Sequence, residues 1–171
     1  YRLAHPGVTF DVLVRDRAAA EAALADHSAD LAIVFEPVRM AEFHTMLRVR
    51  QQLHAVVAAD HPLADRNSLR LQECMEHPLI MPTSQYGVRH LLETALRIST
   101  LEAKPVIQSD SFEFLKSYIR QEHAVSFQIP IGLPHPSKDK MLKSVPISET
   151  DAPPGVLYMG QLQKRALPVA V

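Results

Sequence analysis

The sequence has little of what several classes of protein depend on. A single cysteine, Cys74, excludes an internal disulfide and fits a reducing compartment. The formal net charge is only -1, so nothing draws the chain as a whole toward nucleic acid or an acidic membrane. No apolar run reaches membrane-spanning length, and no signal-peptide pattern opens the chain. We therefore expect a soluble cytoplasmic protein, with any DNA-binding function outside these residues.

Motifs for catalysis and for metal binding are also missing. Four of the nine histidines stand directly before proline, where they start turns, and no pair has a zinc spacing such as His-Glu-x-x-His. No serine sits in a Gly-x-Ser-x-Gly elbow, and helix caps explain Ser84 and Ser111 better than nucleophilic roles. The negative charges of two glutamates near Cys74 disfavour the thiolate form of this residue. We expect no enzyme activity, no metal and no cofactor.

The hydrophobic pattern of the first part of the chain is that of an α/β protein. With 171 residues and 47% hydrophobic residues, the chain can bury a substantial core as one domain or as two small lobes. Alternation over Val8–Arg15 predicts a strand, and the Ala-rich segment Ala18–His27 predicts a short helix. The unbroken apolar run Leu31–Phe35 predicts a strand covered on both faces. Strand, helix and strand in this spacing form a βαβ unit.

Two further strands are predicted before the middle of the chain. Apolar and polar residues alternate over Phe43–Arg50, so one face of that strand should be exposed to solvent. Leu53–Ala59 is a short apolar run stopped by Asp60-His61-Pro62, because proline cannot donate to a strand ladder. This second strand is either a crossover between two lobes or an ordinary sheet strand, and the spacing leaves both interpretations open.

The second half of the chain repeats the strand, helix, strand plan. Ser68 can cap a short helix that runs through about Met75. A longer helix runs through Ile98, and Asp110 and Glu113 stand at capping-box spacing for a helix from about 112 to 121. Strands are predicted at 79–81, 106–108, 124–128, 141–147 and 155–160, with a Pro-rich irregular stretch at 129–140. The last strand can return to the first lobe as a second crossover.

Several short motifs run in one order over nearly the whole chain. They are His5-Pro6-Gly7-Val8, Asp30-Leu31-Ala32-Ile33, Leu53–Ala64, Pro78-Leu79-Ile80, Asp110-Ser111-Phe112 and Val125–Pro130. In this order and spacing the chain resembles the effector-binding domain of LysR-type transcriptional regulators. One departure is Glu122-His123-Ala124, where the family commonly has a glycine pair, so any positive φ there would be unusual.

The resemblance implies a fold similar to type 2 periplasmic binding proteins. Two Rossmann-like α/β lobes would be joined by two crossover strands, with a small ligand in the cleft between them. Lobe I would comprise residues 1–59 and 155–171, incomplete at both ends, and lobe II residues 60–154. An absent N-terminal winged helix-turn-helix would carry all DNA contact.

The candidate ligand site centres on the segment 83–86, with Arg89 one turn into the following helix. Free amides at a helix start, beside the positive end of the helix dipole, favour an anion such as a carboxylate. The alternative is that Ser84 only caps the helix, Tyr86 packs on the surface and Arg89 is solvated. Ligands of α/β sheets also sit beyond the carboxyl ends of strands. The candidates are Val34, Phe35, Pro82, Thr83, Ser84, Gln85, Tyr86, Arg89, Gln128 and Ile129.

Two functions from different classes remain open at this point. The resemblance implies the effector-sensing domain of a LysR-type regulator, which binds a small organic acid. It also implies a homodimer or tetramer, in which the helix Ala18–His27 lies against the second lobe of the partner. The alternative is an exported solute-binding protein of a transport system, which would share the fold.

Overall fold

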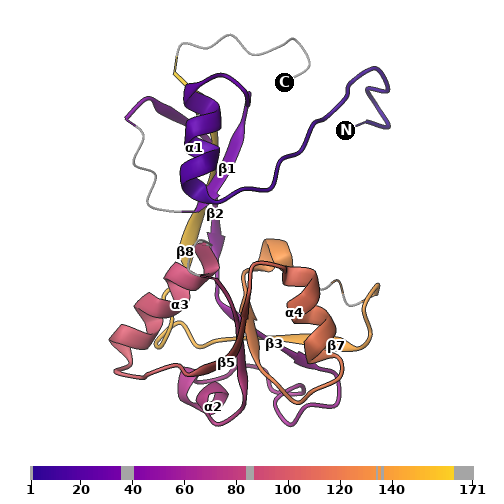
Figure 1. Cartoon of the computed structure of the whole chain (residues 1–171), viewed down its shortest axis with the longest axis vertical. Helices are drawn as coiled ribbons and strands as arrows, with labels where there is room; N and C mark the ends of the chain where they lie inside the picture. The colour runs from indigo at the N-terminus through magenta and orange to yellow at the C-terminus, as the bar shows by residue number, and fades with distance from the viewer. Residues whose placement is uncertain (1, 36–40, 84–86, 134, 136, 164–171) are drawn as a thin grey trace. The chain divides into compact units, whose positions relative to one another are not determined.

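The computed structural model describes residues 2–35, 41–83, 87–133, 135 and 137–163. The chain divides into two compact units (Figure 1). Unit 1 is Tyr1–Arg48 with Tyr158–Val171, and unit 2 is Val49–Leu157. The predicted division into lobes at 59/60 and 154/155 stays a prediction.

Unit 1 is built from one helix and a small sheet. The helix α1 (Arg17–Ala25) begins at Asp16, whose carboxylate accepts a hydrogen bond of 2.8 Å from the Ala19 amide. The sheet has the order β1-β8-β2, with β1 (Ala32–Phe35), β8 (Gly155–Leu162) and β2 (Phe43–Gln51). The boundary between the units falls within β2 and within β8. Leu24 of α1 packs with Ala32, Val34 and Leu162 to form the core of this unit.

The predicted strand Val8–Arg15 is wrong. These residues form no strand, so the first βαβ unit lacks its first member. Val12 and Val14 are 77% and 85% exposed. Alternation only makes a segment compatible with a strand, because a strand also needs a neighbouring backbone to hydrogen-bond with. The sheet order β1-β8-β2 leaves this segment outside the sheet.

Unit 2 contains three strands that run in one direction. β4 (Leu79–Pro82) pairs in parallel with β5 (Pro105–Ser109), and a parallel bridge from Leu79 to Val125 joins β4 to the start of β6 (Ser126–Gln128). β6 pairs in turn with β3 (His54–Ala58), which is antiparallel both to β6 and to β7 (Leu142–Pro146). Of the two interpretations of the Leu53 segment, the ordinary sheet strand is therefore the one observed.

The helices of unit 2 connect and cover these strands. They are α2 (Leu71–Met75), α3 (Gly87–Ile98), α4 (Phe112–Ile119) and the short 3-10 helix η1 (Pro130–Gly132). One core cluster joins strand residues such as Val56 and Ile80 to Leu115 and Ile119 of α4. On α3 the buried residues are those of the predicted apolar stripe, namely Val88, Leu91, Leu92, Ala95 and Leu96.

The predicted start of α2 is wrong, whereas the predicted start of α4 at about 112 is confirmed. α2 begins at Leu71, and Ser68 does not cap it, because the neighbouring Leu69 is held by hydrogen bonds from its amide to the Pro146 carbonyl and from the Ser148 amide to its carbonyl. In α4 the cap is Ser111, whose hydroxyl accepts from the Phe114 amide at 3.2 Å. The predicted capping box of Asp110 with Glu113 is therefore wrong, because Asp110 precedes the cap, and the interpretation of Ser111 as a cap is confirmed.

Backbone strain is confined to two helix ends in the described chain. His27 after α1 and Thr100 after α3 have φ values of 64° and 53°. Glu122-His123-Ala124, which replaces the family's usual glycine pair, takes no positive φ. The Val125 amide instead donates to the Pro78 carbonyl at 2.9 Å, so ordinary residues complete this connection.

A buried carboxylate ties the segment before β8 to α2. Asp151 accepts hydrogen bonds of 2.8 Å from Arg70 Nη2, from Arg70 Nε and from the Leu71 amide. The side chain of Asp151 is 8% exposed, whereas that of Arg70 is 66% exposed. Hydrogen bonds from Arg70 lower the pKa of Asp151 below its ordinary value, although burial acts in the opposite direction. Asp151 therefore acts as a distant cap of α2.

Candidate functional site

The carboxyl ends of β4, β5 and β6 meet at one edge of unit 2. Thr83 follows β4, Ser109 ends β5 and Gln128 ends β6. The Thr83 amide donates to the Ser109 carbonyl at 3.1 Å, so the first two strand ends are joined. The helices α3 and α4 both begin just after these ends. Ligands of α/β sheets sit at such an edge, because the loops and helix starts present polar groups there.

Arg89, on the first turn of α3, is held in place rather than solvated. Its side chain is 16% exposed, and its Nε donates to Glu93 Oε1 at 2.8 Å. Its Nη1 lies 3.3 Å from Gln108 Oε1 and 3.5 Å from the Pro82 carbonyl oxygen. The guanidinium therefore braces the ends of β4 and β5, and Glu93 offsets part of its charge.

Thr83 is the described part of the predicted loop. Its hydroxyl oxygen is buried and has no hydrogen-bond partner in the part of the chain that the structure describes. A buried hydroxyl without a partner carries a desolvation cost, so it favours any polar group brought to it. Ser84, Gln85 and Tyr86 lie outside the described residues.

Gln128 and Ile129, the candidates from β6, differ in character. The Gln128 side-chain oxygen accepts a hydrogen bond of 3.0 Å from the Ile129 amide, while the Ile129 side chain is buried in the core. The Gln128 side chain packs directly against Gly132, which has no side chain. A Cβ added at Gly132 would lie only 2.6 Å from the Gln128 Cδ. Gln128 is thus the polar member of this pair.

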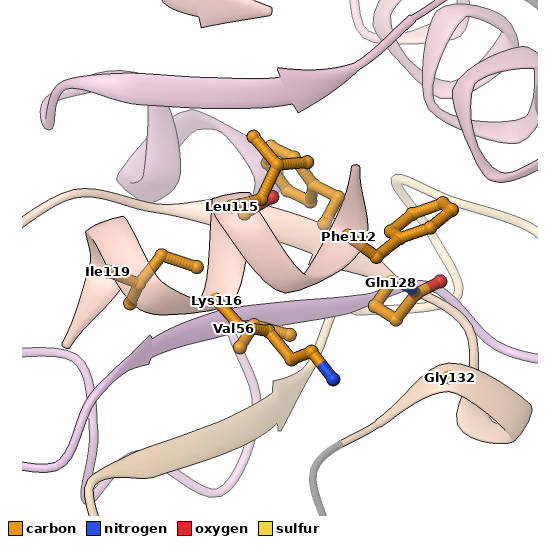
Figure 2. A pocket seen from close by; sticks show the side chains of 9 residues that line it. Val56, Phe112, Leu115, Lys116, Ile119, Gln128 and Gly132 are labelled. Atoms are coloured by element: carbon orange, nitrogen blue, oxygen red, sulfur yellow. The ribbon is translucent and has the colours of Figure 1, made fainter. Parts of the chain in front are cut away.

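A small pocket lies beside Gln128, between α4, β3, β6 and η1 (Figure 2). Its lining is Val56, Phe112, Leu115, Lys116, Ile119, Ser126, Phe127, Gln128 and Gly132. Figure 2 shows the side chains of Phe112 and Gln128 next to each other, close to Gly132. The cavity volume of about 10 Å³ leaves room for about one water molecule. In this form the pocket does not accept an organic ligand.

Sequence reasoning missed two features of this edge. Ser109 and Ser111 bring hydroxyls to the end of β5, where the Ser111 amide donates to the Ser109 hydroxyl at 3.1 Å. Phe112 and Lys116, one turn apart on α4, line the pocket. The signal that could have found the serines is the rule that selected Gln128, namely that ligands sit beyond the carboxyl ends of strands.

The two candidates of unit 1 are core residues. Val34 and Phe35 end β1, and their side chains are buried. Val34 belongs to the core cluster of that unit. Their contact with a ligand stays a prediction, and Glu36, which follows them, lies outside the described residues.

Other chemistries find no support in the described chain. No group of three or more His, Cys, Asp and Glu residues has the arrangement of a metal site there. Cys74 is buried, and burial raises the pKa of its thiol to about 12, so it is not a thiolate nucleophile near neutral pH. Within the described residues, no helix has the length and apolar character needed to cross a membrane.

Comparison with known proteins supplies the family. The model of the LysR substrate binding domain matches residues 1–171. The chain belongs to this family. The HTH-type transcriptional regulator CysB of Burkholderia cenocepacia is 28% identical to the LysR domain described here over 120 residues, which are 70% of this chain and 38% of that protein. The chain thus spans about two fifths of the length of the curated relatives it matches.

Solved structures agree on the fold. The effector binding domain of QuiR in complex with shikimate has a TM-score of 0.78 and 20% identity, over 98% of this chain and 78% of that one. The regulatory domain of Synechocystis PCC6803 CcmR in complex with 2-PG has a TM-score of 0.76 and 19% identity, over 99% and 81%. The predicted LysR resemblance is confirmed, and so is the α/β fold class similar to periplasmic binding proteins.

Proposed function

We propose that this LysR domain senses a small organic acid and controls DNA binding by a winged helix-turn-helix elsewhere in the protein. The observation that carries the proposal is the edge of unit 2 where β4, β5 and β6 end among polar groups. Two structures of similar fold support it, because QuiR is in complex with shikimate and CcmR is in complex with 2-PG. The curated relatives are named as transcriptional regulators, which favours a cytoplasmic regulator over an exported solute-binding protein.

The proposed binding mode places the acid group at the start of α3. The free amides of a helix start, with the positive end of its dipole, favour a carboxylate. The Thr83 hydroxyl has no other partner in the described chain and can bind a ligand oxygen. Gln128, at the end of the neighbouring strand β6, can hydrogen-bond to a second polar group of the ligand. Arg89 completes this set, although Glu93 already offsets part of its charge. The remaining proposed contacts are Val34, Phe35, Pro82, Ser84, Gln85, Tyr86 and Ile129.

Calorimetry of the folded chain against a panel of organic acids that includes shikimate tests this site. We expect Ser84→Ala, Tyr86→Ala and Arg89→Ala each to weaken the acid that binds, with Arg89→Ala weakening anions more than neutral analogues. If Ser84 caps α3, its loss also costs about 0.5–2 kcal/mol of stability, so unfolding must be measured separately. Arg97→Ala, at the exposed end of the same helix, is the matched control. An acid bound equally well by all three variants would place the site elsewhere.

We also propose a homodimer in which α1 contacts the second copy. Ala18 and Ala22, four residues apart on α1, are exposed, and small side chains allow close approach of two backbones. Ala20 faces the core of its own unit instead. Light scattering at tens of micromolar should give the mass of a dimer, and Ala22→Glu should shift it toward a monomer. Ala41→Glu, an exposed change outside α1, should not. A strict monomer before any substitution would contradict the proposal.

A further inference from the structure

Three histidines meet at the edge of unit 2 that lies opposite the candidate site. His61 follows β3, His77 precedes β4 and His123 precedes β6. Because β3 runs antiparallel to β6, the end of β3 lies beside the beginnings of β4 and β6. Three chain connections, distant in sequence, are therefore joined by imidazole rings at this edge.

The rings are in contact. The ring centres of His61 and His77 are 4.5 Å apart in an edge arrangement, and those of His61 and His123 are 5.6 Å apart. Asp60 lies on the outer side, with its Oδ2 3.7 Å from His123 Nε2. His123 and Asp60 are both exposed, so the outer part of this cluster reaches solvent.

His61 is the buried centre of the cluster, with 3% of its surface exposed. Its Nδ1 accepts a hydrogen bond of 3.1 Å from the Leu63 amide, so the neutral ring carries its hydrogen on Nε2. That Nε2 is buried and has no hydrogen-bond partner among the described residues. Protonation would place a hydrogen on Nδ1, break the bond to Leu63 and bury a positive charge between two other imidazoles.

We propose that His61, His77 and His123 form an acid-sensitive clamp, in which protonation drives apart the three connections and destabilises unit 2. This property is independent of the effector site. It is a consequence of packing, because a charge on any one of the rings repels a charge on its neighbours at these distances.

The direction of the pH dependence follows from His61. Burial first, and then the neighbouring His77 and His123 rings, lower the pKa of His61 from its ordinary value of 6.5 to about 4, while Asp60 and the backbone of His123 act in the opposite direction. Between these two values the unfolded chain binds the proton and the folded chain does not. Stability is therefore complete above about pH 6.5 and is lost as the pH falls toward 4.

Two measurements on the whole chain test the clamp. Nuclear magnetic resonance titration of the imidazole signals should give His61 a pKa far below 6.5. Urea unfolding followed by circular dichroism gives the equilibrium constant for unfolding at pH 7.5 and at pH 5.0. The increase in this constant from the higher to the lower pH should be about 25-fold larger in the wild type than in His61→Asn. Asparagine keeps an acceptor near the Leu63 amide but cannot be protonated.

A second variant keeps the test independent of whether His61→Asn folds. The double variant His77→Gln with His123→Gln should raise the pKa of His61 and reduce the loss of stability in acid, because both neighbouring charges are gone. His90→Gln, an exposed histidine on α3, is the matched control and should follow the wild type. A His61 that titrates near 6.5, or a double variant with the wild-type pH profile, would overturn the proposal.

Discussion

Replacing Asp151 with alanine should lower the free energy of unfolding by about 3 kcal/mol. The change removes a buried carboxylate that accepts from Arg70 and from the Leu71 amide. The Leu71 amide, at the start of α2, would lose its partner in the protein interior. Arg70 is largely exposed and can be hydrated, so the loss should stay near the lower end of that for a broken buried ion pair. Urea unfolding at pH 7 measures it.

Two control variants distinguish the effect of losing a buried carboxylate from the effect of losing any negative charge. Asp151→Asn keeps an acceptor for the Leu71 amide and should cost less than Asp151→Ala. Asp65→Ala breaks an exposed ion pair with Lys143 and should cost less than about 1 kcal/mol. The lowered pKa of Asp151 means that its contribution is present above pH 3.8 and is lost as the pH falls through the folded value. Equal losses for Asp65→Ala and Asp151→Ala would contradict this account.

Replacing Gly160 with alanine should destabilise unit 1 by about 3 kcal/mol, at the upper end of the cost of overpacking. An added Cβ would overlap the backbone carbonyl oxygen of His44 and lie 2.5 Å from two ring carbons of Phe43. Gly160 lies in β8 and both neighbours lie in β2, so the clash falls on the contact between two paired strands. A backbone oxygen cannot move aside as a flexible side chain can. Hydrogen exchange should show faster opening of the β2 and β8 amides of unit 1.

Gly7→Ala is the matched control for this substitution. No atom lies within 4 Å of the Cβ that it would add, so its effect should stay within about 0.5 kcal/mol. The amides of α4, in unit 2, serve as an internal reference in the same exchange experiment. If Gly160→Ala matched Gly7→Ala in stability and exchange, the close approach of β8 to β2 would not hold in solution.

The sequence predicted local structure best where one short segment determines it. The apolar stripe of α3 is an example, because its period alone selects the buried face. The segment Val8–Arg15 shows the opposite case, since its alternation is real but a strand also depends on a partner supplied from elsewhere. The start of α2 failed for a related reason. Leu69 forms a parallel β-bridge with the distant Ile147, so the helix begins beyond Ser68, at Leu71.

The candidate site was predictable in position but not in detail. The anion affinity of a helix start selected Thr83, and the rule that ligands sit beyond the carboxyl ends of strands selected Gln128. The bracing of Arg89 by Gln108 and by the Pro82 carbonyl could not be read from the sequence, because it depends on the pairing of β4 with β5. The histidine cluster was hidden for the same reason. Each of His61 and His77 stands before a proline and was interpreted as a turn residue, which leaves their shared contact unseen.

The sheet order of unit 1 also sets the sequence of events during synthesis on the ribosome. β8 lies between β1 and β2, yet it is made after every strand of unit 2. Until β8 emerges, β1 and β2 have no central strand to join, whereas the strands of unit 2 have already left the exit tunnel in order. Because domains tend to fold as units while the chain grows, we expect unit 2 to fold first, as an insertion in the middle of a unit that still lacks its central strand. The strands β1 and β2 are therefore made before the strands of unit 2, but they gain their central strand only after them.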